Sequence, residues 1–321
     1  MQKVWAAVDL GGTKIACALA SEDGRLITTE SVPTLSAEGP QAVLRRIAAL
    51  VCGLCDRAGA GPAAIGMGVP GLVDIGTGVT RFLPNLPGQW RDVPAGAVLS
   101  EHCGCPVFLL NDARLATLGE LEFGHGRGVN GMLFFTVGTG IGGGVVINRQ
   151  LQLGPLGAAG ELGHQTILPD GPRCGCGNRG CLETLASGPA IAAEGLRLLE
   201  TGLAPKLHER TAGNPAAVNP REMALAADAG DELVREAILR AARYLAIGAA
   251  NIVTALHPDL VVIGGGVAAI GPLLIDEVRA HMRERVRMFP SETVRVERSL
   301  LEDKAGLWGG IALARARSGG A

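Results

Sequence analysis

A chain of 321 residues, 47% of them hydrophobic, is long enough to form two domains with buried cores. A formal net charge of −2 without blocks of like charge argues against nucleic acid or an anionic membrane as a partner. The sequence has no apolar run of about 18 residues, and its first residues do not have the pattern of a signal peptide, so we expect a cytoplasmic protein with reduced thiols.

The expected elements alternate between strands and helices. Residues 4–19 and 132–147 each predict a strand, a glycine turn and a second strand. Apolar stripes at helical spacing predict helices over 40–58 and 231–256, and a last helix is expected at about 304–317. Further strands are expected within 64–74, 106–111 and 259–264, and 201–222 is expected to be a surface loop. This order predicts an α/β fold, and the repeated strand pair suggests two similar halves.

Three glycine-rich turns could hold phosphate. They lie at 11–14, 138–144 and 264–266, each at the end of an apolar strand. Backbone N–H groups exposed by glycine can bind an anion, although for each turn taken alone an ordinary tight turn is the better interpretation. The second matches G-x-G-x-x-G, but a β-branched strand follows it where a dinucleotide site requires a helix, which excludes that fingerprint.

The stretch from Gly163 to Glu183 combines a histidine with three cysteines. His164, Cys174, Cys176 and Cys181 form the Cys₃His set typical of structural zinc, and a disulfide is disfavoured by the expected reducing compartment. Two other cysteine groups are expected to be ordinary residues: Cys52 with Cys55, and Cys103 with Cys105 beside His102.

Asn111 and Asp112 end an apolar strand, where α/β sheets open onto their binding crevice. Asp112 there suits a general base for phosphoryl transfer. From spacing alone, an Asx turn or a cap for the following helix is the favoured interpretation of this pair.

The motifs DLGGTK, NDA, GTGIGGG, GELGH, CGCGNRGC and GGGV occur in the order seen in the ROK family of sugar kinases, and the resemblance covers nearly the whole chain. It implies a two-domain actin/hexokinase-like (ribonuclease H-like) fold with a cleft between the domains. We expect a small domain of residues 1–113 plus about 304–321, and a large domain of about 114–303 with the zinc loop. Arg114 departs from the family, in which many members have Asn there.

The resemblance also implies the binding residues and cofactors. The ATP phosphates and Mg²⁺ would be held by Asp9, Gly11, Gly12, Thr13, Lys14, Gly138, Thr139, Gly140 and Gly142. Adenosine would lie against Gly264, Gly265, Gly266 and Val267. The sugar would be bound by Asn85, Asn111, Asp112, Glu161, His164 and Glu183, with Asp112 as the catalytic base. Zinc would take one ring nitrogen of His164 and leave the other facing the sugar.

We therefore predict an ATP-dependent hexose kinase, most similar to glucokinases, with ATP, Mg²⁺ and structural Zn²⁺ as cofactors. N-acetylmannosamine kinase is the alternative activity, followed by fructokinase and N-acetylglucosamine kinase, because the sequence does not fix the shape of the sugar pocket. A sugar-sensing regulator is a remote alternative: family regulators carry an N-terminal helix-turn-helix, for which the sequence before Asp9 leaves no room. An actin-like ATPase would not need the sugar-binding set. Family members are commonly dimers or tetramers, so we expect a homodimer or homotetramer.

Overall fold

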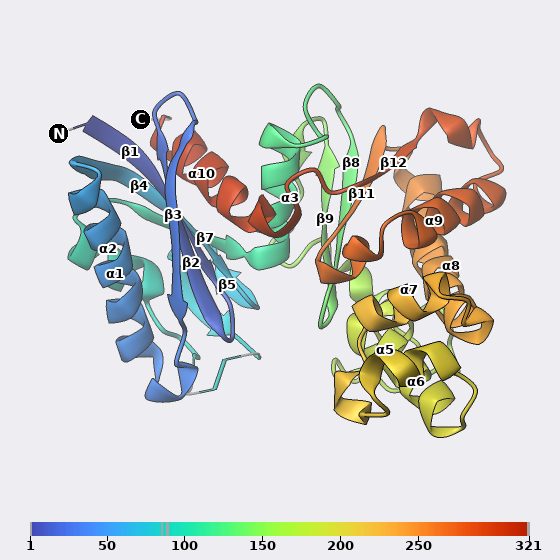
Figure 1. The fold of residues 1–321 in the computed structure, drawn as a ribbon. Coiled ribbons are helices and arrows are strands. Elements are labelled where there is room, and N and C mark those ends of the chain that lie inside the picture. The colour runs from blue at the N-terminus through green and yellow to red at the C-terminus, as the bar shows by residue number, and fades with distance from the viewer. Residues whose placement is uncertain (1, 85, 88–89, 320–321) are drawn as a thin grey trace. The chain divides into compact units, whose positions relative to one another are not determined.

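The computed structural model describes residues 2–84, 86–87 and 90–319. The chain divides into two compact units. Unit 1 contains the residues up to Arg127, Leu151–Ala159 and the residues from Lys304 on, and unit 2 contains Gly128–Gln150 and Gly160–Asp303. Each unit has a central five-stranded sheet, so the two similar halves predicted from the repeated strand pair are present (Figure 1).

The sheet of unit 1 has the strand order β3-β2-β1-β4-β7. Its strands are β1 (Gln2–Leu10), β2 (Lys14–Ser21), β3 (Leu26–Pro33), β4 (Ala60–Val69) and β7 (Val107–Asn111), with a separate ribbon of β5 (Leu72–Asp74) and β6 (Val79–Phe82). β1, β2 and β3 pair antiparallel, whereas β1, β4 and β7 run parallel. In this register Asp9 lies opposite Gly68, and Asn111 lies opposite Val69. The carboxyl ends of three parallel strands therefore bring these polar residues to one edge of the sheet.

Helices cover both faces of this sheet. α1 (Pro40–Arg57) and α2 (Ala95–Cys103) share a core with Val4, Ala6, Val8 and Leu10 of β1, whereas Ala7, which points the other way, packs against α10 (Ala305–Ser318). α3 (Asp112–Phe123) lies beside α10. These two helices approach closely because Gly119 faces the Ala305 carbonyl and Gly309 faces that of Leu115, where any Cβ would overlap the backbone.

The sheet of unit 2 has the order β10-β9-β8-β11-β12. Its strands are β8 (Met132–Val137), β9 (Ile141–Ile147), β10 (Gln150–Leu151), β11 (Leu260–Gly264) and β12 (Arg295–Arg298). β8 and β9 are antiparallel, and β8, β11 and β12 are parallel, as are β1, β4 and β7 in unit 1. The fully buried β11 and the nearly buried β8 account for their continuous apolar sequences.

The core of unit 2 is completed by six α-helices of the described chain: α4 (Leu182–Ala186), α5 (Gly188–Glu200), α6 (Pro205–Thr211), α7 (Pro220–Asp228), α8 (Glu232–Leu256) and α9 (Pro272–Arg285). The prediction of a surface loop over 201–222 is wrong in part, because α6 and the start of α7 lie there. α6 forms because Leu207 is completely buried and its N–H donates to the Asp231 carboxylate at 2.7 Å. No helix of the described residues has the length and hydropathy to cross a bilayer.

The boundary between the units also differs from the one drawn at 113/114. α3 and the segment 151–159 belong to unit 1. The close helix pair at Gly119 and Gly309 is the physical reason, because it ties α3 to a helix of unit 1 along its length.

Candidate active site

The first glycine turn joins β1 to β2. The Gly11 N–H donates to the Lys14 carbonyl at 2.9 Å, and a Cβ on Gly11 would lie 2.9 Å from that same oxygen, so the turn needs glycine. Thr34, next to the end of β3, fixes the turn from outside: its hydroxyl donates to Gly11 O at 2.7 Å and its N–H to Thr13 O at 2.8 Å. Gly12, Thr13 and Lys14 are exposed on this fixed turn, as a phosphate-binding loop requires.

Asp9 and Asp112 lie on either side of Gly68. A Cβ on Gly68 would be 3.5 Å from both Asp9 Oδ1 and Asp112 Cα. A Cβ on Gly306, at the start of α10, would lie 3.1 Å from the other Asp9 carboxylate oxygen. Burial raises the pKa of the Asp9 carboxyl, and the Lys14 cation partly opposes that shift. A bound divalent cation would favour the ionised form of this carboxylate.

Asn111 and Asp112 occupy the junction of β7 and α3. The Asn111 Oδ1 accepts the N–H groups of Ala113 at 3.0 Å and Arg114 at 3.3 Å, so Asn111 is the helix cap. Asp112 is the first residue of the helix, and its Oδ1 accepts the Ala113 N–H at 2.8 Å. The capping role expected for this pair therefore belongs to Asn111. The capped helix holds the half-buried Asp112 carboxylate at the edge of the sheet.

The second glycine turn, at Gly138–Gly140, lies between β8 and β9 in unit 2. The carboxylate of Glu183 is directly beside it: Oε2 accepts the Ile141 N–H at 2.9 Å, and a Cβ on Gly140 would overlap this oxygen. The Gly188 N–H, at the start of α5, donates to Gly138 O at 2.8 Å. Glu183, predicted as a sugar ligand, therefore also supports the predicted phosphate loop.

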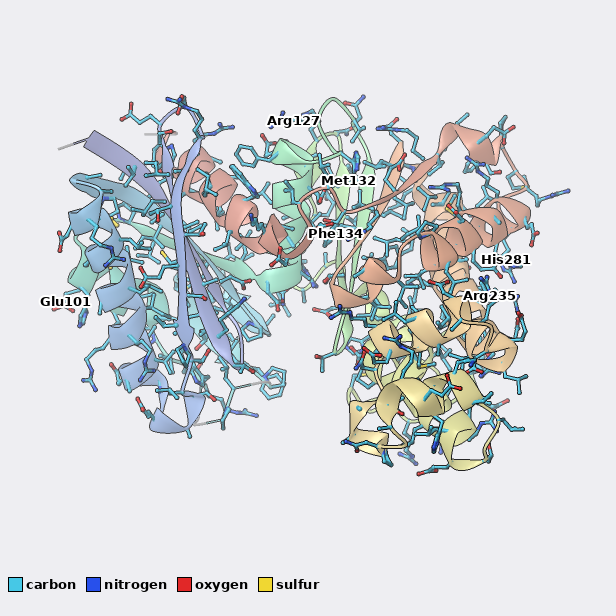
Figure 2. All side chains as sticks on the ribbon, viewed as in Figure 1. Glu101, Arg127, Met132, Phe134, Arg235 and His281 are labelled. Atoms are coloured by element: carbon cyan, nitrogen blue, oxygen red, sulfur yellow. The ribbon has the colours of Figure 1, made fainter. Side chains whose placement is uncertain are left out.

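The third glycine turn follows β11 and adjoins the second. Gly265 has φ +82° and lies so close to Val137 that a Cβ would overlap the Val137 carbonyl. Phe134, labelled on β8 in Figure 2, closes the other side, 2.9 Å from the position that a Cβ on Gly264 would take. The carboxyl ends of two neighbouring parallel strands, β8 and β11, thus carry both predicted nucleotide loops of this unit.

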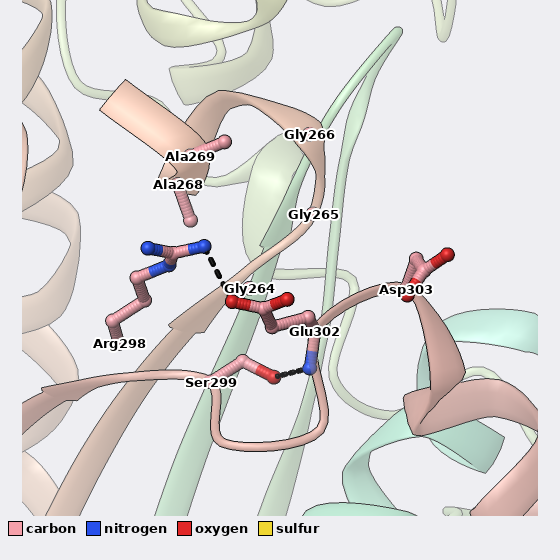
Figure 3. A pocket seen from close by; sticks show the side chains of 9 residues that line it. All are labelled: Gly264, Gly265, Gly266, Ala268, Ala269, Arg298, Ser299, Glu302 and Asp303. Atoms are coloured by element: carbon pink, nitrogen blue, oxygen red, sulfur yellow. Dashed lines mark hydrogen bonds and ion pairs between the residues drawn. The ribbon is translucent and has the colours of Figure 1, made fainter. Parts of the chain in front are cut away.

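A pocket of about 190 Å³ opens beside this third turn (Figure 3). Its lining combines the turn with the chain after β12: Gly264, Gly265, Gly266, Ala268, Ala269, Arg298, Ser299, Glu302 and Asp303. Arg298 donates to the Glu302 carboxylate at 2.6 Å, and the Glu302 N–H donates to Ser299 Oγ at 2.9 Å. Of the adenosine residues predicted, the three glycines line the pocket, whereas Val267 is buried next to it. The residues from 298 to 303 were missed, since no motif in the sequence marks them.

The segment 160–164 lies directly on β9. Gly163 has no room for a Cβ, which would overlap the Ile141 carbonyl. A Cβ on Gly160 would lie only 3.0 Å from Gly144 Cα. This contact fixes the short 3₁₀ turn Leu162–His164. From it, Glu161 is exposed, and its Oε2 lies 3.9 Å from His164 Nε2.

The other ring nitrogen of His164 faces the cysteines. His164 Nδ1 lies 3.6 Å from Cys174 Sγ, and the Sγ atoms of Cys176 and Cys181 are 3.8 Å apart. All four candidate ligand atoms lie within 4.8 Å of one another. In a tetrahedral site with Zn–S bonds of about 2.3 Å, the sulfurs would be about 3.8 Å apart, so the residues fit zinc.

Electrostatics support a cation there. Burial, followed by the neighbouring thiols of Cys174 and Cys176, raises the pKa of the Cys181 thiol to about 12. Three ionised sulfurs this close together repel one another, and a bound metal cation compensates their charge as its binding releases the thiol protons. The Asn178 amide donates to Cys181 Sγ at 3.6 Å and adds a partner around the set.

Asn85 lies outside the described residues. Cys55 and Cys105 are buried in the core of unit 1, where burial raises the pKa of each thiol to about 11, as expected for inert core residues. In the described part of the chain, the His164 group is the one set of His, Cys, Asp and Glu side chains with the spacing of a metal site.

Comparison with known proteins gives the family. The ROK family pattern matches residues 5–317. The chain is 37% identical to "Glucokinase" of Thermotoga maritima over 98% of each chain. A ROK family glucokinase from Streptomyces griseus, solved in complex with glucose and AMPPNP, has a TM-score of 0.84 and 33% identity over 98% of this chain and 99% of that one. "Xylose repressor" of Caldicellulosiruptor bescii is 31% identical over 95% of this chain and 76% of its own length. The predicted α/β, actin/hexokinase-like fold is confirmed, and the chain belongs to the ROK family.

Proposed function

We propose that this protein is an ATP-dependent glucokinase, which transfers the γ-phosphoryl group of ATP to the 6-hydroxyl of glucose. The predicted sugar kinase activity is confirmed by the full-length similarity to glucokinases, one of them solved with glucose and an ATP analogue. A repressor also matches most of the chain. Membership of the family therefore does not distinguish an enzyme from a regulator, and the distinction rests on residues that could perform the reaction.

The observation that carries the proposal is the pair of carboxylates around Gly68. Phosphoryl transfer needs a group that accepts the proton of the attacking hydroxyl and a group that helps hold the metal on the phosphates. Asp112, at the first turn of a capped helix, suits the first role, and Asp9, beside an exposed glycine turn with Lys14, suits the second. A repressor that only senses sugar needs neither.

The remaining chain supplies binding and orientation. Mg²⁺, when bound with ATP, would neutralise the charge that develops on the transferred phosphoryl group. Backbone N–H groups at the Gly11 and Gly138 turns would hold the phosphates, and the pocket at Gly264–Gly266 would hold adenosine. Asp112 would take the proton of the sugar 6-hydroxyl as the new P–O bond forms.

The sugar-binding and zinc assignments support the same proposal. A carboxylate accepts two neighbouring hydroxyls, and Glu161 with the Nε2 of His164 offers both an acceptor and a ring nitrogen next to each other. Zinc at Nδ1 would fix the ring, so its role is positional and no substrate needs to reach the ion. A homo-oligomeric assembly and a cytosolic location remain predictions.

An ADP-release assay over glucose, fructose, N-acetylglucosamine and N-acetylmannosamine tests the proposal. We expect glucose to have the highest kcat/KM. Asp112→Asn, purified in parallel, should reduce the signal by at least about 100-fold and so exclude a contaminating kinase. A tenfold preference for N-acetylmannosamine, about 1.4 kcal/mol in transition-state free energy, would establish the alternative activity. ADP release with none of the sugars would refute the proposed function.

A further inference from the structure

Arg114 is a large side chain that is almost completely buried, although it carries a permanent charge. It lies in the first turn of α3, is 1% exposed, and follows Asp112 by two residues. Its Nε donates to Ala159 O at 2.8 Å, Nη2 donates to Ala158 O at 3.0 Å, and Nη1 donates to Asn111 Oδ1 at 3.1 Å. One guanidinium thus joins two consecutive carbonyls of the 151–159 segment to the cap residue of α3.

Only arginine can make this set of contacts. Its planar fork directs several N–H donors in fixed directions, whereas a lysine ammonium is a single nitrogen on a flexible stem. Burying a charge is costly unless its hydrogen bonds are made, so a buried guanidinium is retained only where its partners are fixed. The arrangement is therefore a rigid connection rather than a surface contact.

Asn111 is held from several sides at once. Its Oδ1 accepts Arg114 Nη1 in addition to the two backbone N–H groups of the helix cap, and its Nδ2 donates to Gly71 O at 3.2 Å. With three donors already bound, this oxygen has no lone pair left for a ligand. Among the described residues the second Nδ2 hydrogen has no acceptor, so the amide can offer a ligand only a donor.

The segment on the other side of Arg114 is also connected to a predicted sugar ligand. Ala159 is two residues before Glu161 in the chain, and its carbonyl and that of Ala158 are held by the guanidinium. The Ala159 N–H donates to Leu153 O at 3.0 Å, which closes 153–159 into a loop within unit 1. Arg114 therefore anchors the last residues before Glu161.

We propose that Arg114 is a positioning residue for sugar binding, which fixes the Asn111 amide as a hydrogen-bond donor and anchors the chain that leads into Glu161. This inference rests on the proposed function. Arg114 itself does not need to touch the sugar, and the three hydrogen bonds described above go to Asn111, Ala158 and Ala159 rather than to a glycine turn. Its loss should weaken sugar binding selectively.

The test uses Arg114→Met, which removes the charge and the donors, and Arg114→Lys, which keeps the charge and should fold even if the Met variant does not. Leu44→Ala, a cavity in the α1 core of the same unit, is the control for lost stability. Calorimetry gives the Kd for glucose and for a non-hydrolysable ATP analogue. Hydrogen exchange without ligand measures the protection of the 151–163 peptide.

We expect both Arg114 variants to raise the glucose Kd at least tenfold, to change the Kd of the ATP analogue less than twofold, and to exchange faster at 151–163. Leu44→Ala should lower the melting temperature without changing the glucose Kd. A wild-type glucose Kd in both Arg114 variants, or an equal rise in Leu44→Ala, would overturn the inference. If the wild-type chain binds no hexose, the proposed function is wrong. If hydrogen exchange at 151–163 is the same in the Arg114 variants as in the wild type, the anchoring role is wrong, whatever the glucose Kd.

Discussion

Replacing Gly140 by alanine tests the contact between the second glycine turn and Glu183. The new Cβ would overlap Glu183 Oε2 and lie 3.3 Å from Cδ, and it would meet nothing else within 4 Å. The backbone at Gly140 is outside the left-handed region, so alanine itself is not strained. Glu183 must therefore swing away and give up its bond from the Ile141 N–H.

The cost follows from that single bond. Losing a hydrogen bond to a charged group costs about 1.5–3 kcal/mol. Replacing glycine with alanine at a compatible position recovers about 0.4–1 kcal/mol by restricting the unfolded chain. The net loss is about 1–2 kcal/mol, which corresponds to a fall of about 2–8 °C in melting temperature for a unit of this size. Since Glu183 is also a proposed sugar ligand, the glucose KM should rise as well.

A double-mutant cycle with Glu183→Ala isolates the contact. Calorimetric melting of the four proteins should show that Gly140→Ala is slightly stabilising once the carboxylate is gone, with a coupling energy of about 1.5–3 kcal/mol, the free energy of the lost hydrogen bond. If Gly140→Ala lowers the melting temperature equally in both backgrounds, the overlap with Glu183 is not its cause and the support of the loop by this carboxylate is wrong.

The remaining predictions concern the base, the metal and the nucleotide pocket. Asp112→Asn should lower kcat by at least about 10² while the glucose Kd stays near the wild-type value; near-normal turnover would remove Asp112 from the mechanism. Elemental analysis should find about one zinc per chain, and Cys176→Ala should lose it, raise the KM for sugar more than that for ATP and melt earlier, whereas Cys52→Ala and Cys103→Ala should do none of these. Active enzyme without zinc would contradict this role. Ala269→Trp, at an exposed position of the 190 Å³ pocket, should raise the KM for ATP about tenfold with an unchanged KM for glucose; an unchanged KM for ATP would place adenosine elsewhere.

Much of the fold could be predicted because periodicity and glycine turns report it locally. The helix expected over 40–58 is observed as Pro40–Arg57, and the two strand pairs occur where the repeat placed them. Periodicity in the long helix does not predict which apolar residues are buried: Leu233 is half-exposed, whereas Val234 is buried, because the packing of neighbouring elements decides which face is covered. α6 could not be predicted from periodicity either, because it is short and is stabilised by a hydrogen bond from the Leu207 N–H to the distant Asp231 carboxylate.

For the candidate site, motifs identified residue types better than contacts. The spacing of the cysteines with His164 was sufficient to predict a set that the structure brings within 4.8 Å. The burial of Arg114, the overlap of Gly140 with Glu183 and the lining from Arg298 to Asp303 could not be predicted, because each joins segments that are distant in sequence. Only the packed chain shows that these segments meet.

The late position of α10 in the chain has a consequence for biosynthesis. Unit 2 is complete once residue 303 has been made, but unit 1 still lacks the helix that packs on Ala7, Ala18 and Ala20 of its sheet. During translation at about 5–20 residues per second, that apolar sheet face stays uncovered although its strands are among the first to leave the ribosome. A chain truncated after Asp303 should therefore expose this sheet face to chaperones and proteases, whereas its unit 2 should be protected.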